Sequence, residues 1–214
     1  MESPDLAALR AEYAREGLEE ADAGTDPVDL FAQWLEVAVT AGIHEPNAMA
    51  LATADTSGRP SVRIVLLKGF DAAGAVFYTN YDSRKGRELV ANPLASAVLL
   101  WHQLQRQVRI EGRVERVEPE LSDAYFASRP RGAQIGAVAS QQSRSVGDRE
   151  ALEAKVADVE RTFDGRDVQR PEHWGGYRIT LDAVEFWQGR ADRVHDRLRF
   201  TRVGDGWSRE RLQP

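Results

Sequence analysis

Short strand-like segments joined by tight turns fill the middle of the chain, and they limit the folds that it can adopt. Five stretches have the residue types and spacing of β-strands, namely 48–54, 61–68, 75–80, 95–101 and 106–118. The turns DTSG and DAAG join the first three, and connections this short pair successive strands as antiparallel hairpins. The pattern therefore favours an antiparallel barrel over a doubly wound parallel sheet.

Helical patterns flank this strand region. Asp26 and Pro27 supply an N-cap and a first-turn proline before apolar residues at helical spacing, and Gly42 ends that helix. Further helices are expected after Ser83, at 120–128 and at 148–163. Strands return at 177–187, 193–203 and 207–212. The predicted fold class is α+β, mainly antiparallel β, with about seven or eight strands and peripheral helices. We expect an N-terminal arm over 1–24 and a single domain over 25–214.

The composition excludes several classes of protein. The chain holds no cysteine, and its four histidines show no pair at metal-ligand spacing, so neither a disulfide nor a metal site is predicted. Its first residues lack the apolar core of a signal peptide and no apolar run approaches a membrane span, so we expect a cytoplasmic protein. A net charge of -6 argues against nucleic acid as a partner. Basic residues nonetheless form short clusters, which suit small anions.

The first such cluster is the motif RIVLLK, from Arg63 to Lys68. Read alone, it is a buried strand with charged ends. Because the two cations lie five residues apart, a regular strand points them to opposite faces. They should therefore serve different groups, unless a bulge intervenes.

The second motif, FYTNYDSRKGREL at 77–89, brings hydroxyl groups and cations together. It ends a strand at Tyr78 and Thr79 and places Arg84 and Lys85 at a predicted helix start. Hydroxyls, backbone N–H groups at a helix N-terminus and two cations suit a phosphate monoester. A solvated basic turn is the alternative interpretation.

Two later motifs also carry arginines. YFASRPRGAQIGA at 125–137 sets Arg129 and Arg131 around a proline in a semi-rigid loop, where arginine forks can bind phosphate. Its alternative is a helix end with surface arginines. EFWQGRADRVHDR at 185–197 is expected to place Arg193, His195 and Arg197 on one side of a strand. Three such groups repel one another, so an anionic or electron-rich ligand is expected there.

The motifs in this order closely resemble the pyridoxine 5′-phosphate oxidase family. They are LRAEY at 9–13, RIVLLK, VFYTN, SRK, RQV, YFxSRPR, QIGA, QQS, WGG, EFWQG and RxHDR, and the resemblance extends to the C-terminal RLQP. It implies a split β-barrel that binds FMN at the interface of a homodimer. It also implies hydride transfer from C4′ of a phosphorylated B6 vitamer to the flavin, which O2 reoxidises with release of H2O2.

The resemblance also implies roles for residues that match its motifs. FMN would contact Arg63, Ile64, Val65, Leu66, Leu67, Lys68, Tyr78, Thr79, Arg84 and Lys85 of one subunit. The partner subunit would add Gln107, Gln142, Ser143, Trp187 and Arg197. Substrate would contact Lys68, Tyr125, Arg129 and Ala133 at its phosphate, Arg193, Val194 and His195 at its ring, and Arg10 and Tyr13 of the arm. Arg197 and His195 are the catalytic candidates, which orient the pyridine ring.

One residue departs from the family's pattern, and the protonation of another is not determined by the sequence. Ala133 replaces a serine hydroxyl usual in the family, a loss of about 0.5–1.5 kcal/mol in substrate binding. Neighbouring arginines would lower the pKa of His195 while a phosphate would raise it, and the sequence does not decide between them. One alternative function is a related FMN-dependent oxidase of the phenazine-biosynthesis type, without the substrate-phosphate residues. Another is a non-catalytic split barrel that binds flavin, heme or pyridoxal phosphate.

Overall fold

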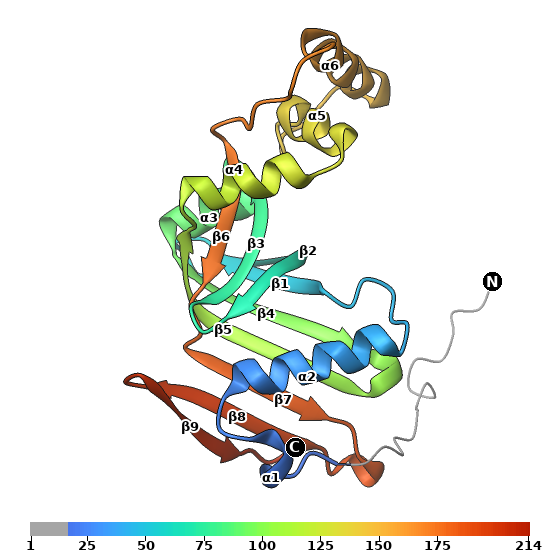
Figure 1. The fold of residues 1–214 in the computed structure, drawn as a ribbon. Coiled ribbons are helices and arrows are strands. Elements are labelled where there is room, and N and C mark those ends of the chain that lie inside the picture. The colour runs from blue at the N-terminus through green and yellow to red at the C-terminus, as the bar shows by residue number, and fades with distance from the viewer. Residues whose placement is uncertain (1–16) are drawn as a thin grey trace, which may run out of the picture. The chain divides into compact units, whose positions relative to one another are not determined.

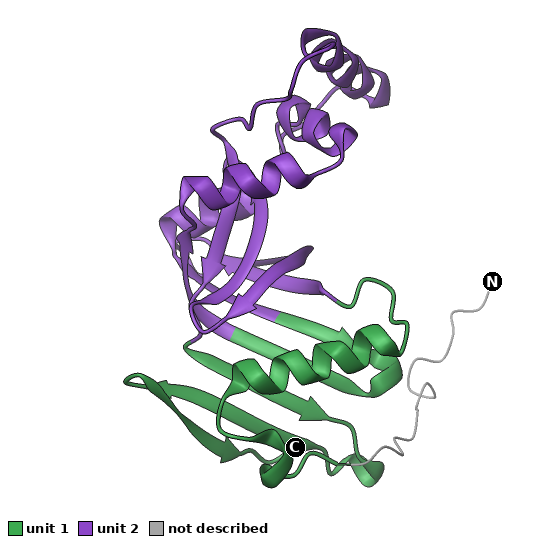
Figure 2. Cartoon of the chain, viewed as in Figure 1, with its two compact units in different colours: residues 1–46, 98–110, 182–214 green, residues 47–97, 111–181 purple. Residues whose placement is uncertain are grey.

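The structure, a computed structural model, describes residues 17–214 (Figure 1). These residues form two compact units (Figure 2). The first unit combines the described residues up to Pro46 with Val98–Ile110 and Asp182–Pro214. The second unit combines Asn47–Ala97 with Glu111–Leu181. Each unit therefore draws on segments that are distant in sequence.

An antiparallel barrel organises the strands, as the short turns predicted. Hairpins link β1 (Ala48–Ala54), β2 (Pro60–Asp71) and β3 (Gly74–Asn80). The other barrel strands are β4 (Leu94–Trp101), β5 (Arg106–Arg116) and β6 (Trp174–Ile179). The order β4-β1-β2-β3-β6-β5, with an additional pairing between β4 and β5, closes the six strands into a barrel. The predicted fold class is confirmed.

Gly112 shows how closely the barrel strands pack. A Cβ atom added there would lie 1.6 Å from the carbonyl oxygen of Thr180. A larger residue at this position would displace the backbone, so the strand needs a glycine.

The second unit has four helices, α3 (Arg84–Ala91), α4 (Pro119–Ser128), α5 (Arg131–Ala139) and α6 (Arg149–Thr162). Of these, α3 and α4 pack against its strands while α6 packs against α5. Ser83 accepts a hydrogen bond from the Gly86 amide and so caps α3, as predicted. A buried cluster joins α4, α5 and β6, and α6 packs against it; its members are Phe126, Ile135, Val168 and Trp174. The helix α5 was not predicted, because Gly132 and Gly136 lower its intrinsic propensity, and burial of Ile135 stabilises it instead.

The first unit combines one long helix, α2 (Pro27–Thr40), with the three strands β7 (Ala183–Gln188), β8 (Asp196–Val203) and β9 (Gly206–Arg211). It also contains α1 (Glu20–Ala23), η2 (His102–Leu104) and η3 (Ala191–Arg193). Asp26 accepts a hydrogen bond from the Val28 amide and caps α2. Trp34 on the buried face of α2 meets Phe186 edge-on at 5.2 Å between ring centroids. The predicted start of this helix is confirmed.

Two predicted strands have different bounds in the structure. The stretch 177–187 is two strands, because β6 pairs with β3 and β5 whereas β7 pairs with β8. This division raises the strand count of the described residues to nine. The strand predicted from residue 193 begins only at Asp196. Asp192 and Arg193 have φ angles of 53° and 61°, which a β-strand cannot accommodate.

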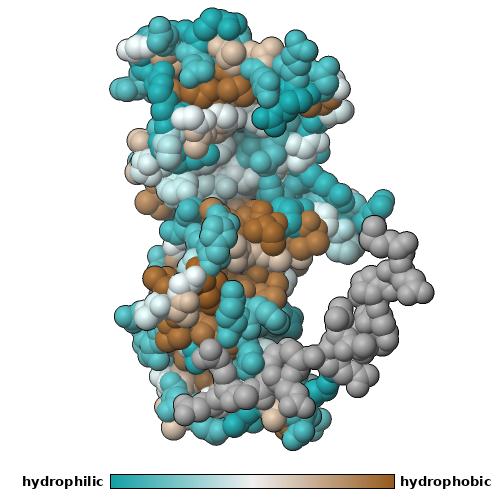
Figure 3. Space-filling view, turned by 90° about the vertical axis from the view of Figure 1, so that its right-hand side faces the viewer, coloured by the Kyte–Doolittle hydropathy of each residue, from teal (hydrophilic) through white to brown (hydrophobic). Residues whose placement is uncertain are grey.

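Apolar residues, brown in Figure 3, lie on the surface among hydrophilic ones. On β2 of the second unit, Val62 and Ile64 are 68% and 66% exposed. Both residues lie on β2, two positions apart, so their side chains point to the same face of the strand. None of the described helices has the length and apolar character needed to cross a membrane.

Candidate functional site

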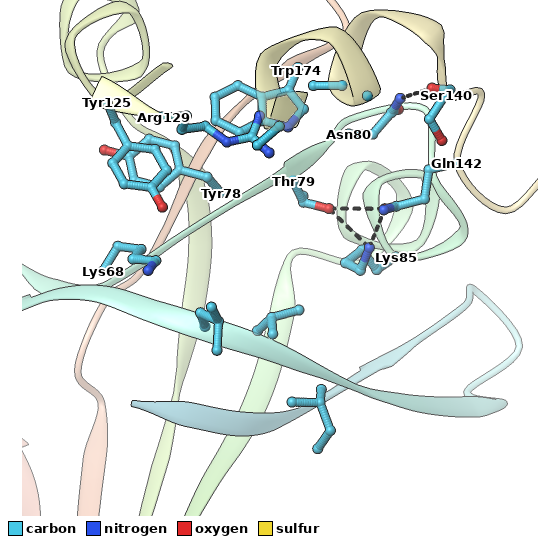
Figure 4. A pocket seen from close by; sticks show the side chains of 16 residues that line it. Lys68, Tyr78, Thr79, Asn80, Lys85, Tyr125, Arg129, Ser140, Gln142 and Trp174 are labelled. Carbon is cyan, nitrogen blue, oxygen red and sulfur yellow. Dashed lines mark hydrogen bonds between the residues drawn. The ribbon is translucent and has the colours of Figure 1, made fainter. Parts of the chain in front are cut away.

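The second unit contains a cavity of about 500 Å³ (Figure 4). It lies among β2, β3, the start of α3 and the helices α4 and α5. Its lining residues are Ile64, Val65, Leu66, Lys68, Tyr78, Thr79, Asn80, Lys85, Tyr125, Arg129, Ala133, Gly136, Ala137, Ser140, Gln142 and Trp174. The structure therefore brings together residues from several motifs that are distant in sequence.

The charged side chains that line this cavity are all positive. Lys68, Lys85 and Arg129 contribute three cations, and the residues lining the cavity include no aspartate or glutamate. Cations without a carboxylate partner repel one another and favour an anionic ligand. The cavity is therefore suited to phosphate esters.

Lys85 marks one end of the cavity. Its Nζ donates to Thr79 Oγ1 at 2.9 Å and to Gln142 Oε1 at 2.7 Å. Burial, followed by repulsion from Arg63, lowers the pKa of Lys85 to about 8. Gly86 lets the helix start approach closely, since a Cβ there would lie 1.9 Å from the Tyr81 carbonyl oxygen. Lys85 lies beside the N-terminus of α3, which also attracts anions. A bound anion there would favour the charged form of Lys85.

Arg129 lies in an aromatic cluster of the same cavity. Tyr78 and Tyr125 stack at 3.9 Å between ring centroids, and the Arg129 guanidinium lies 4.7 Å from the Trp174 ring centre. Among the described atoms, Arg129 Nη1 is buried and has no hydrogen-bond partner. A buried donor of this kind costs stability unless a ligand satisfies it. The unpaired donor fits a phosphate oxygen.

Lys68 reaches the same part of the cavity through a bulge. The register of β2 against β3 shifts between Leu67 and Gly69. Leu67 is buried and does not line the cavity, while Lys68 lies 5.9 Å from the centre of the Tyr125 ring. The bulge therefore turns Lys68 toward Tyr125.

Arg63 and Arg84 do not line the cavity; both bind the buried Glu88. Arg84 Nε lies 2.8 Å from Glu88 Oε1, and Arg63 Nη2 lies 3.3 Å from Oε2. Arg63 also donates to Thr53 Oγ1 at 2.7 Å. Arg63 and Lys68 thus serve different groups, although the bulge between Leu67 and Gly69 means that their spacing alone does not account for it. Burial would raise the pKa of Glu88, but hydrogen bonds from Ser61, Thr53 and Arg84 outweigh it and hold the pKa at about 2.

Arg131 also lies away from the cavity. Its guanidinium donates to the carbonyl oxygens of Phe163 and Arg166, at 2.7 and 2.9 Å. Of the two arginines that flank Pro130, only Arg129 therefore lines this site.

The other candidate residues that the structure describes lie either in the segment after α5 or in the first unit. Ser143 is exposed, with a φ of 70°. Gln107 lies on β5 and is half-buried. Arg193 and Val194 are exposed in the loop before β8. Arg10 and Tyr13 lie outside the described residues.

Arg197 and His195 have defined partners in the first unit. Arg197 makes a two-point ion pair with the buried Glu185, through Nε at 2.8 Å and Nη2 at 3.1 Å. The hydrogen bond to Glu185 raises the pKa of Arg197. His195 Nδ1 accepts from the Arg190 amide at 3.1 Å, and its ring lies 4.7 Å from that of Trp187. The expectation that Arg193, His195 and Arg197 share one face of a strand is wrong, because only Arg197 lies on β8.

Sequence reasoning missed several residues at these places. Trp174 in the WGG motif carries the stacking surface for Arg129, and Glu185 in EFWQG holds Arg197. Both lie in motifs that supported the resemblance without an assigned role. Asn80 and Ser140 also line the cavity, and the Asn80 amide donates to the Ser140 carbonyl at 3.1 Å.

Comparisons of the sequence with protein families and with known proteins point to the same family. Two family models match: pyridoxamine 5′-phosphate oxidase over residues 35–163, and the pyridoxine 5′-phosphate oxidase C-terminal dimerisation region over residues 174–214. The pyridoxine/pyridoxamine 5′-phosphate oxidase of Rubrobacter xylanophilus is 57% identical, covering 98% of this chain and 97% of that protein. Its counterpart in Synechocystis is 50% identical over the full length of both.

Solved structures agree on the fold. PhzG from Burkholderia lata, solved with tetrahydrophenazine-1-carboxylic acid, is 37% identical, with a TM-score of 0.86 over 91% of this chain and 95% of that one. An FMN-binding protein related to pyridoxamine 5′-phosphate oxidase, from Nostoc punctiforme, has a TM-score of 0.68 at 17% identity, over 86% and 97% of the two chains. From its matched models and its relatives along the whole length, the chain belongs to the pyridoxamine 5′-phosphate oxidase family.

Proposed function

We propose that this protein oxidises pyridoxine 5′-phosphate and pyridoxamine 5′-phosphate to pyridoxal 5′-phosphate, with FMN as cofactor and O2 as electron acceptor. The observation that carries the proposal is the buried, unpaired Arg129 Nη1 in a cationic cavity without carboxylates. The relatives that are 50–57% identical bear the name of this activity.

Lys68, Tyr125 and Arg129 bind the substrate phosphate in this proposal. The two cations offset the charge of a phosphate dianion, and the Tyr125 phenol adds a hydroxyl donor. The Tyr78–Tyr125–Trp174 stack orients the Arg129 fork, because the guanidinium lies against Trp174. Ala133 lines the same region and offers no hydroxyl. Fixing the phosphate places the opposite end of the ring for reaction.

FMN is held at the other end of the cavity, around Lys85, Thr79 and Gln142. Gln142, which the resemblance assigned to the partner subunit, lies beside Lys85 of the same chain. When bound, FMN supplies the hydride acceptor, and O2 takes up the electron pair to give H2O2. Lys85 lies at the N-terminal end of α3, where backbone N–H groups add to its charge. Arg63, held by Glu88, contributes to the positive potential here without lining the cavity. A flavin cofactor is what membership of this family implies.

Residues of the first unit complete the site from the partner subunit in this proposal. The C-terminal residues 174–214 match a dimerisation region, and Trp187, His195 and Arg197 lie within it. Exposed Val62 and Ile64 on β2 supply apolar surface for a subunit contact. Cytoplasmic location remains a prediction from the sequence.

Aerobic incubation of the purified protein with FMN and pyridoxamine 5′-phosphate tests this function. We expect pyridoxal 5′-phosphate and H2O2 in a 1:1 ratio, whereas unphosphorylated pyridoxamine should react far more slowly because it has no group for Arg129. A yellow protein that forms neither product would instead be a non-catalytic flavin binder. Oxidation of tetrahydrophenazine-1-carboxylic acid, the compound with which PhzG was solved, but not of the vitamer phosphate would favour the phenazine-type alternative.

A further inference from the structure

Each nitrogen of the Arg197 guanidinium donates a hydrogen bond within the first unit. Nε and Nη2 donate to the two carboxylate oxygens of Glu185 at 2.8 and 3.1 Å, and Nη1 donates to the Gln213 carbonyl oxygen at 2.9 Å. We propose that Glu185 is a positioning residue, which holds Arg197 in its ligand-binding orientation before a ligand arrives. The inference rests on the proposed function, in which Arg197 reaches the ligands of the partner subunit.

Strand pairing places Glu185 and Arg197 side by side. The register of β7 against β8 pairs Trp187 with Arg197 and Glu185 with Arg199. Paired residues share a face of the sheet, as do residues two positions apart on a strand, so Glu185 is the diagonal neighbour of Arg197. Long side chains reach across this diagonal. The ion pair therefore follows from the register, and its formation requires no ligand.

The end of the chain also holds Arg197. Directly after β9, the Leu212 amide donates to the Arg197 carbonyl oxygen at 2.9 Å. This backbone contact keeps the next residue beside β8, where the Gln213 carbonyl oxygen accepts from Nη1. A planar guanidinium that is bound by a carboxylate and by a carbonyl has few orientations left. Both acceptors therefore restrict the Arg197 side chain.

Burial makes Glu185 a rigid anchor. The exposed fraction of its side chain is 8%, and Arg109 Nη1 also lies 3.4 Å from its Oε2. A carboxylate removed from water must keep a cationic partner, because an unpaired buried charge is strongly destabilising. Glu185 is therefore committed to its guanidinium partners, and it acts on a ligand only through Arg197.

The anchored guanidinium still has donors for a ligand. A guanidinium carries five N–H groups, and the contacts with Glu185 and Gln213 use three of them. These contacts leave over one N–H on Nη1 and one on Nη2, and the Arg197 side chain is 26% exposed. Both donors suit an electron-rich oxygen or nitrogen atom of a bound ring. A side chain already held in place loses less conformational freedom on binding than a mobile arginine does.

NMR of holoenzyme labelled with ¹⁵N-arginine tests the orientation without turnover. The Nε–H signal of Arg197 is identified by its loss in Arg197→Met. We expect this N–H to be protected from exchange with solvent before pyridoxal 5′-phosphate is added, and to change little when it binds. The protection should be lost in Glu185→Gln. An Arg197 Nε–H that becomes protected only with pyridoxal 5′-phosphate present would overturn the proposal.

A double-mutant cycle tests whether Glu185 acts through Arg197. Glu185→Gln keeps the size of the side chain but removes its charge and one acceptor oxygen. At saturating FMN, this change should lower kcat/KM about tenfold in the wild type and less than about twofold in Arg197→Met. An equal fall in both backgrounds would mean that Glu185 acts independently of Arg197. That result, or a wild-type kcat/KM in Glu185→Gln, would contradict the positioning role.

Glu210→Gln is the matched control. Glu210 is exposed on β9, so the change removes the same charge from a different strand of the first unit. We expect its kcat/KM to match the wild type. If Glu185→Gln does not fold, Glu185→Asp keeps the charge but shortens the reach, and its effect should depend on Arg197 in the same way. If the wild-type protein oxidises no vitamer phosphate, the proposed function fails while the NMR result still stands.

Discussion

Replacing Arg129 with methionine separates a ligand-binding arginine from a structural one. Among the described atoms, Arg129 Nη1 is buried without a hydrogen-bond partner, and burial lowers the pKa of the guanidinium. Methionine keeps an unbranched stem against Trp174 and removes the unpaired donor. A structural arginine would leave the protein less stable when removed, whereas Arg129 should not.

The size of the effect follows from the contact that would be lost. A hydrogen bond to a charged group contributes about 1.5–3 kcal/mol, so KM for pyridoxamine 5′-phosphate should rise about 10- to 150-fold in Arg129→Met. The free energy of unfolding of the ligand-free protein should stay within about 1 kcal/mol of wild type, because an unsatisfied donor is removed along with its packing. Steady-state kinetics and denaturant titration measure the two quantities.

Arg131→Met is the matched control. This arginine lies two residues further on and donates to the Phe163 and Arg166 carbonyl oxygens, away from the cavity. We expect its KM to match wild type. The reasoning would be refuted if Arg129→Met had the wild-type KM. It would also be refuted if Arg129→Met lost more than about 2 kcal/mol in free energy of unfolding while Arg131→Met raised KM as much as Arg129→Met does.

Three further predictions follow from the site. Ala133→Ser should lower KM for the vitamer phosphate about two- to tenfold if the new hydroxyl reaches the phosphate; an unchanged KM would place the phosphate elsewhere. Lys85, with a pKa of about 8, should lose its charge above that pH, so FMN affinity by fluorescence titration should fall as pH rises from 8, and Lys85→Met should abolish this dependence. Because the unfolded lysine binds its proton more tightly, ligand-free wild type should also gain stability over the same range. Glu88→Gln should cost about 1–3 kcal/mol at pH 7; since the folded pKa is about 2, the difference should shrink as pH falls from about 4.5 toward 2, and a difference independent of pH would contradict the ion-pair account.

Local patterns in the sequence were sufficient for most of the fold. The turns at 55–58 and 71–74 determined the β1–β2–β3 hairpins, and caps at Asp26 and Ser83 marked the starts of α2 and α3. The errors arose where tertiary structure overrides local pattern. Residues 177–187 alternate without a strong turn signal, yet the chain leaves β6 at Ile179 and pairs with a new neighbour in β7. The local residue pattern at 177–187 does not indicate this change of strand partner.

Only part of the candidate site could be predicted, because motifs identify residues but not the contacts that the fold creates between them. Motifs identified Lys68, Tyr125 and Arg129, which the fold gathers in one cavity. They could not indicate that Arg63 and Arg84 turn to a shared carboxylate, because Glu88 meets them only through the folded β2 and α3. The left-handed turn at Asp192 and Arg193, which removes His195 from the strand, also lacks a glycine that would have marked it.

A crystal structure of the protein with FMN and pyridoxal 5′-phosphate tests the central claim most directly. We predict two phosphate groups per protomer in the second unit, one within hydrogen-bonding distance of Lys85 and Thr79 and the other bound by Arg129 Nη1, Lys68 and Tyr125. His195 and Arg197 should reach the vitamer ring from the other subunit. A vitamer phosphate bound away from Arg129, or a cavity that admits only one of the two esters, would contradict the account.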